Sequence, residues 1–195
     1  MAAMPFVAFS QSIEEVTVTA TRKVESLQDI PLSVQALDAE ALESQHIESG
    51  RDLAIAIPGF SFTSGVGSGS ASRMRGLIMP AVTAASVDAN QTMINGHTIP
   101  NSTFGEMGFF DAERIEILNG PQGTLYGRNT LAGALNLYSN EPTPDGFEAS
   151  LDSSFARFNK VRNEAAVNIP ISDKTALRVA ALKQTSDGFI ANSVG

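Results

Sequence analysis

Cysteine is absent from the 195 residues, and histidine occurs only at His46 and His97. The absence of cysteine excludes disulfides, thiol catalysis and cysteine-ligated metals. Two histidines far apart in sequence do not suggest a histidine-rich metal site, so no cofactor is expected. The sequence also lacks an uninterrupted run of about 18 apolar residues, which excludes a membrane-spanning helix.

Basic residues are fewer than acidic ones, so the formal net charge is -8. No lysine lies between Lys23 and Lys160. A Walker loop needs a lysine after its glycines, and duplex binding needs clustered lysine and arginine. Nucleotide and nucleic-acid binding are therefore not expected. There is no G-x-S-x-G elbow and no metal-ligand cluster, and the acidic side chains of Asp111, Glu113 and Glu116 are interpreted as a solvated or salt-bridged strand edge. These absences argue against an enzyme.

What the chain does contain is a glycine-rich loop between two alternating segments. Its 43% hydrophobic and 17% charged residues suit one globular domain. Ile115 and Ile117, then Leu135 and Leu137, alternate with polar or small residues, which predicts two half-buried strands. The glycines between them permit a tight turn, and their spacing is not that of a dinucleotide-binding fingerprint. They are Gly120, Gly123, Gly127 and Gly133.

The string DAERIEILNGPQGTLYGRNT, which begins at Asp111, and the string GALNL, which begins at Gly133, carry a resemblance. Together they closely resemble the plug-domain signature of TonB-dependent outer-membrane receptors. The resemblance implies an α/β plug domain, with a small mixed sheet, short helices and long loops. It also implies that the first antiparallel strands of a truncated transmembrane β-barrel follow, in the outer membrane of a Gram-negative bacterium.

The resemblance implies roles for individual residues of this plug. The residues expected to form the signature or to contact the barrel are Arg75, Gly76, Arg114, Glu116, Gly120, Pro121, Gln122, Gly123, Tyr126, Gly127, Arg128 and Asn129. Asn119 stands where the family usually has arginine. One plug-to-barrel ion pair is therefore in doubt, and Arg75, Arg114 and Arg128 are expected to hold the plug.

A second segment with an implied role lies near the start of the chain. Residues 14–22 alternate β-branched and small side chains, and they read as an unpaired strand that can add to the sheet of another protein. The stretch resembles the TonB box of the family, through Glu15, Val16, Thr17, Val18, Thr19 and Ala20. The implied partner is TonB with its inner-membrane energising complex.

Short elements are predicted between these two segments. Asp38 is expected to cap a helix that runs to about Ile47, and Ser49 and Asp52 have capping-box spacing before a second helix. Strands are predicted at residues 30–36, 60–63, 73–78 and 91–96, the last ending in an Asn-Gly turn, and loops at 65–72 and 101–108.

The sequence pattern changes after the Pro/Gly hinge at residues 141–146. Residues 147–195 contain alternating segments with room for about three strands of roughly 10 residues. Barrels of such transporters use about 22 strands, so the chain is expected to be incomplete. The predicted division is 1–10 as a signal-peptide remnant, 11–29 as TonB-box segment and linker, 30–140 as plug, 141–146 as hinge and 147–195 as barrel strands.

Two functions remain open at this point. The resemblance implies energised uptake of a scarce solute, such as a ferric siderophore, across the outer membrane. In that mechanism the TonB box is released and the plug sheet rearranges or partly unfolds, without covalent chemistry. The alternative is a stand-alone periplasmic binding module that uses the plug fold without a barrel.

Overall fold

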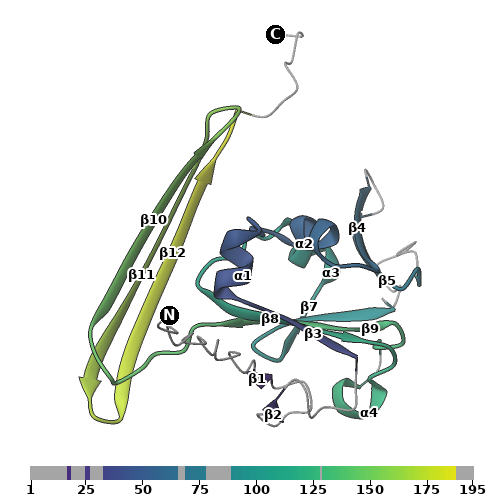
Figure 1. Ribbon diagram of the computed structural model, residues 1–195, viewed down its shortest axis with the longest axis horizontal. Coiled ribbons are helices and arrows are strands. Elements are labelled where there is room, and N and C mark those ends of the chain that lie inside the picture. The colour runs from purple at the N-terminus through teal and green to yellow at the C-terminus, as the bar shows by residue number, and fades with distance from the viewer. Residues whose placement is uncertain are drawn as a thin grey trace, which may run out of the picture.

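The computed structural model describes residues 17–18, 25–26, 33–65, 69–77, 89–127 and 129–187. Two parts lie side by side in Figure 1. Residues 33–140 form a sheet covered by helices, which we call the sheet unit. Residues 148–185 form three long strands beside it, which we call the wing.

The sheet unit is built on five strands in the order β3-β8-β9-β6-β7. These are β3 (Val34–Asp38), β8 (Ala112–Asn119), β9 (Gly133–Ser139), β6 (Asn90–Ile94) and β7 (His97–Ile99). The pairing of β6 with β9 is parallel and the other pairings are antiparallel. The sheet is therefore mixed and small, as the resemblance implies.

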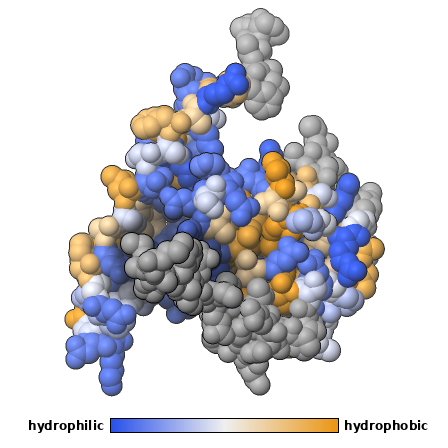
Figure 2. Space-filling view, in the orientation of Figure 1, coloured by the Kyte–Doolittle hydropathy of each residue, from blue (hydrophilic) through white to orange (hydrophobic). Residues whose placement is uncertain are grey.

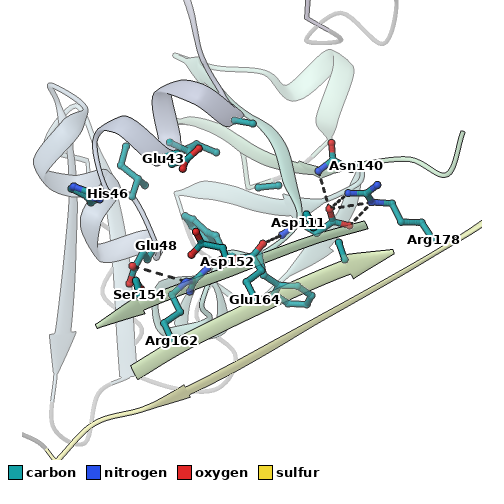
Figure 3. Close-up of a pocket in the computed structure, with 18 residues that line it drawn as sticks. Glu43, His46, Glu48, Asp111, Asn140, Asp152, Ser154, Arg162, Glu164 and Arg178 are labelled. Atoms are coloured by element: carbon teal, nitrogen blue, oxygen red, sulfur yellow. Dashed lines mark hydrogen bonds and ion pairs between the residues drawn. The ribbon is translucent and has the colours of Figure 1, made fainter. Parts of the chain in front are cut away.

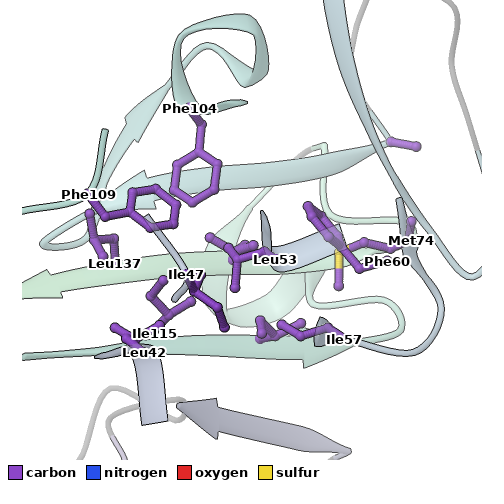
Figure 4. Close-up of a cluster of buried hydrophobic side chains, with 14 residues drawn as sticks. Leu42, Ile47, Leu53, Ile57, Phe60, Met74, Phe104, Phe109, Ile115 and Leu137 are labelled. Atoms are coloured by element: carbon purple, nitrogen blue, oxygen red, sulfur yellow. The ribbon is translucent and has the colours of Figure 1, made fainter. Parts of the chain in front are cut away.

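Three helices cover one face of this sheet: α1 (Ala39–Ser44), α2 (Gly50–Ala56) and α3 (Asn101–Glu106). Their buried side chains Leu42, Leu53 and Phe104 pack with Ile115 and with the other core residues shown in Figure 4. The rings of Phe104 and Phe109 lie 5.1 Å apart, centroid to centroid. Phe104 and Phe109 thus belong to the core, whereas the neighbouring Phe110 is exposed.

The central strands β8 and β9 differ from the sequence prediction, because they are buried on both faces. Glu116 and Leu118 are both 0% exposed, although they alternate with the core residues Ile115 and Ile117. The second face is covered by a smaller apolar cluster made of Val18, Met93, Leu118 and Ala134. A half-buried strand was the wrong expectation, since the sequence pattern does not show what packs on the second face.

The starts of the first two helices are set by acidic side chains. Asp38 accepts a hydrogen bond of 2.8 Å from the amide of Ala41, which confirms the predicted cap of α1. Asp52 Oδ2 accepts hydrogen bonds from the Ser49 hydroxyl, at 2.7 Å, and from the amide of Glu48, at 3.1 Å. The Ser49 side chain makes no cap hydrogen bond to the helix amides, so the reciprocal bonds of a capping box are not formed, although Ser49 and Asp52 contact each other.

One of the two hairpins of this unit was predicted incorrectly. Strand β4 (Phe60–Gly65) was expected, but β5 (Gly69–Met74) occupies most of the predicted loop at 65–72. The predicted strand at 73–78 is wrong beyond Met74, because Arg75 and Gly76 have positive φ values of 53° and 75° and form a turn. The regular pairing of β5 with β4 stabilises a Gly/Ser-rich strand that its own propensity disfavours.

The other hairpin is confirmed, because Asn95 and Gly96 both have positive φ between β6 and β7. The predicted loop at 101–108 is wrong, since α3 occupies residues 101–106. A Cβ atom at Gly105 would lie 1.5 Å from the ring of Phe62. The glycine that suggested a loop is therefore needed for close packing of the helix against β4.

Three short elements lie on the opposite side of the sheet from α1, α2 and α3 (Figure 1). They are β1 (Thr17–Val18), β2 (Glu25–Ser26) and α4 (Gly123–Tyr126). Strand β1 pairs with β2, so the expectation of an unpaired strand is wrong for Thr17 and Val18. The other four residues predicted as the TonB box lie outside the described residues.

The wing consists of β10 (Glu148–Ala156), β11 (Lys160–Ser172) and β12 (Thr175–Thr185), paired antiparallel in that order. Large apolar side chains are exposed on it, at Leu151, Phe155, Ile169, Leu177 and Val179, and just before it at Phe147. Figure 2 shows apolar residues along the outer margin of the wing and polar residues where it meets the sheet unit. In the described part of the chain, no helix is long and apolar enough to cross a membrane.

Candidate functional site

The glycine-rich loop closes onto itself between β8 and β9. The amide of Gly120 donates to the carbonyl of Ala132 at 3.0 Å, and the amide of Gln122 donates to the carbonyl of Thr130 at 3.0 Å. Gly120 and Gly127 have φ values of 91° and 80°, in the region that glycine tolerates best. The loop is a structural turn that uses its own amides, so it does not present them to a phosphate.

The remaining signature positions of this loop are divided between its inside and its surface. Gln122 is buried at the start of α4, whereas Pro121 and Gly123 are exposed and Tyr126 is half-buried. Asn129 has a positive φ of 72°. Arg128 lies outside the described residues. The described positions form one compact turn.

Arg114 belongs to a charged group within the sheet unit. Its Nε lies 2.8 Å from Glu116 Oε1, it also pairs with Glu113, and its guanidinium lies 4.0 Å from the centre of the Tyr138 ring. Burial alone would lower the pKa of Arg114, but the hydrogen bond to Glu116 and the charges of Glu113 and Glu116 outweigh it, so this pKa is raised. Arg114 is therefore a permanent cation that neutralises a buried carboxylate.

Arg75 and Gly76 lie beside the glycine-rich loop. The amide of Arg75 donates to the carbonyl of Gly59 at 2.7 Å. The Nη1 atom of Arg75 lies 3.6 Å from the position that a Cβ atom on Gly120 would occupy. Within the described residues, the ion pairs that join the sheet unit to the wing include neither Arg75 nor Arg114.

Other residues make those contacts. Lys160 of β11 pairs with Glu48 at 2.5 Å, and Arg162 Nη2 donates to the carbonyl of Phe109 at 2.5 Å. Arg178 of β12 pairs with Asp111, at 2.5 Å between Nη2 and Oδ1. Figure 3 shows Arg162 and Arg178 of the wing with Glu48 and Asp111 of the sheet unit.

A cavity of about 470 Å³ separates α1 from the wing, beside these contacts. Glu43 of α1 and His46, just after α1, line it on one side, and Asp152 and Ser154 line it from β10 (Figure 3). Its lining contains the carboxylates of Glu43, Glu48, Asp111, Asp152 and Glu164, and the guanidinium groups of Arg162 and Arg178. The lining therefore carries more acidic than basic groups, and it also includes apolar side chains such as Leu42, Ile47 and Phe110.

Sequence reasoning missed Asp111, Arg162, Glu164 and Arg178 as contact residues. Asp111 was interpreted as part of a solvated or salt-bridged strand edge; it is salt-bridged and only 9% exposed, but its partner Arg178 was not predicted. A usable signal was present, because Arg162, Glu164 and Arg178 occupy the polar positions of alternating strands. Charged side chains on the inward face of such strands are expected to have partners.

Among the residues predicted as the TonB box, Val18 is the one whose side-chain burial is described. Its side chain is 0% exposed and packs with Met93, Leu118 and Ala134 on the second face of the sheet. Strand β1 pairs Val18 with Glu25 and Thr17 with Ser26. Val18 is therefore docked on the sheet unit.

A mixed five-stranded sheet with a closed signature loop, a docked N-terminal strand and a wing of alternating strands defines a plug-domain protein. The family model described as the TonB-dependent receptor plug domain matches residues 26–134. The chain belongs to the TonB-dependent receptor family, and the sheet unit is its plug.

Similar proteins agree with this assignment. The catecholate siderophore receptor Fiu of Escherichia coli (strain K12) is 39% identical over 71 residues, which are 36% of this chain and 9% of Fiu. The iron-regulated outer membrane virulence protein of Vibrio cholerae serotype O1 is 28% identical over 177 residues, which are 85% of this chain and 27% of that protein. The chain therefore spans a small part of the length of these relatives.

Solved structures share the fold. The ferric yersiniabactin uptake receptor FyuA from Yersinia pestis matches with a TM-score of 0.68 and 22% identity, over 78% of this chain and 24% of that one. The alcaligin outer membrane receptor FauA from Bordetella pertussis matches with a TM-score of 0.71 and 21% identity, over 88% of this chain and 29% of that one. These relatives are outer-membrane receptors, and family membership places this protein in the outer membrane of a Gram-negative bacterium.

Proposed function

We propose that this chain is the plug and part of the barrel wall of a TonB-dependent receptor that takes up a scarce solute such as a ferric siderophore. The observation that carries the proposal is the arrangement of the wing, whose polar side faces the plug and whose apolar side faces outward. The relatives named as receptors for catecholate siderophores and for ferric yersiniabactin support the class of solute.

The wing fits a wall between lipid and a polar interior. Leu151 and Phe155 of β10 are each 77% exposed, and Val179 of β12 is 55% exposed. Asp152 of β10 and Arg178 of β12 instead line the cavity beside the plug. Alternation of apolar-out and polar-in side chains is typical of transmembrane β-strands. We accordingly divide the chain into a TonB-box segment and linker at 11–29, a plug at 30–140, a hinge at 141–146 and wall strands from 147.

The N-terminal strand is proposed as the segment that binds TonB. A partner that adds a strand needs the backbone groups of Glu15 to Ala20, and β2 and the plug sheet already occupy part of this segment. TonB therefore competes with the docked arrangement. A solute that binds more tightly to the receptor with β1 released shifts the population toward the state that TonB can bind.

Binding to the TonB C-terminal domain tests this proposal. The receptor and its Val18→Pro variant are compared in a pull-down, because proline removes the backbone donor that a ladder needs. We expect the wild type to bind and the variant to bind at least about tenfold more weakly.

Synthetic peptides of residues 14–22, with valine or proline at position 18, separate strand pairing from docking on the plug. The valine peptide is expected to bind TonB and the proline peptide is not. Equal binding by the two peptides contradicts the TonB-box proposal, whatever the result with the receptor.

A further inference from the structure

Asp111 connects the plug with two strands of the wing at once. Its carboxylate receives Arg178 Nε at 2.8 Å through Oδ2 and Nη2 at 2.5 Å through Oδ1. Its own amide donates to Glu164 Oε1 at 2.6 Å. One residue thus accepts from β12 and donates to β11. We call Asp111, Asn140, Glu164 and Arg178 the Asp111 cluster.

The plug itself fixes the position of Asp111. Asn140 Nδ2 donates to Asp111 Oδ1 at 2.9 Å, and the amide of Asn140 donates to the carbonyl of Asp111 at 2.9 Å. These bonds connect the start of β8 with the end of β9. Asp111 has a positive φ of 48°, which aspartate and asparagine tolerate better than most residues. The backbone is therefore held in the conformation in which its amide reaches Glu164.

The ion pair of the cluster is shielded from water. The side chains of Arg178 and Asp111 are 15% and 9% exposed. Two donors of one guanidinium bind the two oxygens of one carboxylate, which is a strong and geometrically specific arrangement. Removal of one partner would leave the other charge largely buried without compensation.

The cluster lies at one border of the cavity between α1 and the wing. Asp111 and Arg178 line this cavity together with Glu43 of α1 and with His46, just after α1 (Figure 3). At this border of the cavity the Asp111 cluster makes direct contact between the plug and the wing.

We propose that the Asp111 cluster holds the plug on β11 and β12, with Asp111 and Arg178 acting as one unit. The signature arginines suggest ion pairs in which the plug supplies the cation. In the Asp111 cluster the plug supplies the carboxylate and the wall supplies the guanidinium. The proposal concerns contacts within this chain, and it goes beyond the proposed uptake function without depending on the solute or on TonB.

Amide hydrogen exchange on the purified full-length protein tests the proposal. The amide at position 111 reports the bond to Glu164, and the amide of Asn140 reports the bond to Asp111. Asp111→Asn removes the charge and keeps a side chain that tolerates positive φ, and Arg178→Gln removes the guanidinium. We expect each substitution to accelerate exchange at both amides about tenfold or more, and the double variant to exchange no faster than the faster single one.

Matched controls are Asp173→Asn in the turn between β11 and β12 and Arg157→Gln in the turn between β10 and β11, both outside the cluster. Single variants that exchange like their controls, or effects that multiply in the double variant, would overturn the proposal. If a variant also loses protection at Ile115–Leu118, Arg178→Lys is measured instead. If the amide at position 111 exchanges more slowly in Arg178→Lys than in Arg178→Gln, the proposal is supported. Equal exchange in these two variants overturns it.

Discussion

At the scale of single residues, the plug depends on a charge placed inside its central sheet. Glu116 is 0% exposed in β8 and is neutralised by Arg114, which also contacts Glu113 and Tyr138. A buried carboxylate is tolerated only when a partner compensates it. The conformation of Arg114 is thus dictated by the interior of the plug.

Substitution of Arg114 is expected to destabilise the plug more than removal of the whole pair. Arg114→Gln leaves the Glu116 carboxylate without the guanidinium and should lower the free energy of unfolding by about 3 kcal/mol. The double variant Arg114→Met/Glu116→Leu removes both charges and should lose less. Urea unfolding measures both, and a double variant less stable than the single one would contradict this explanation.

Two glycines of the signature region are expected to respond in opposite ways. A Cβ at Gly133 would lie 2.2 Å from the carbonyl oxygen of Leu118, and Gly133 has a φ of +153°. Gly133→Ala should therefore cost at least about 2 kcal/mol, because the neighbouring backbone must move. Gly123 has nothing within 4 Å of such an atom, so Gly123→Ala should leave the thermal midpoint nearly unchanged.

At the scale of elements, the sequence predicted those whose signals are local. Asp38 capped α1 as expected, and the Asn95-Gly96 turn joined β6 to β7. Strand β5 and helix α3 could not be predicted in this way. Pairing with β4 stabilises β5, and α3 contains Gly105 because Phe62 of β4 leaves no room for a side chain there.

The cap of α1 gives a prediction at this scale. Asp38→Ala should lower the free energy of unfolding by about 1 kcal/mol, because the amide of Ala41 loses its acceptor. Asp38→Asn retains an oxygen acceptor and should lose only a few tenths of that amount. Equal losses for both variants, measured by urea unfolding, would mean that the charge of Asp38 and not its hydrogen bond stabilises α1.

The candidate site was predicted only in part for a related reason. The signature strings indicated the family and the turn, since both depend on residues close in sequence. The contacts between plug and wing join positions more than 50 residues apart, as Asp111 and Arg178 do. Their register depends on how the wing lies beside the plug, which alternation alone does not determine.

At the scale of the whole molecule, the wing has two unlike sides. Its inner side contacts the plug through charged residues, and its outer side exposes large apolar residues without a partner among the described residues. A receptor whose wall faces lipid and whose plug fills the interior accounts for both sides.

Accessibility of two neighbouring residues in β10 tests this account most directly. The 195 residues contain no cysteine, so Leu151→Cys and, in a second protein, Asp152→Cys each provide a single site in this chain for a spin label. In native outer-membrane vesicles, the label at position 151 is expected to be more accessible to oxygen, which concentrates in lipid. The label at position 152 is expected to be more accessible to a water-soluble nickel chelate. The reverse order, or equal accessibility at both positions, would contradict the placement of the wing between lipid and plug.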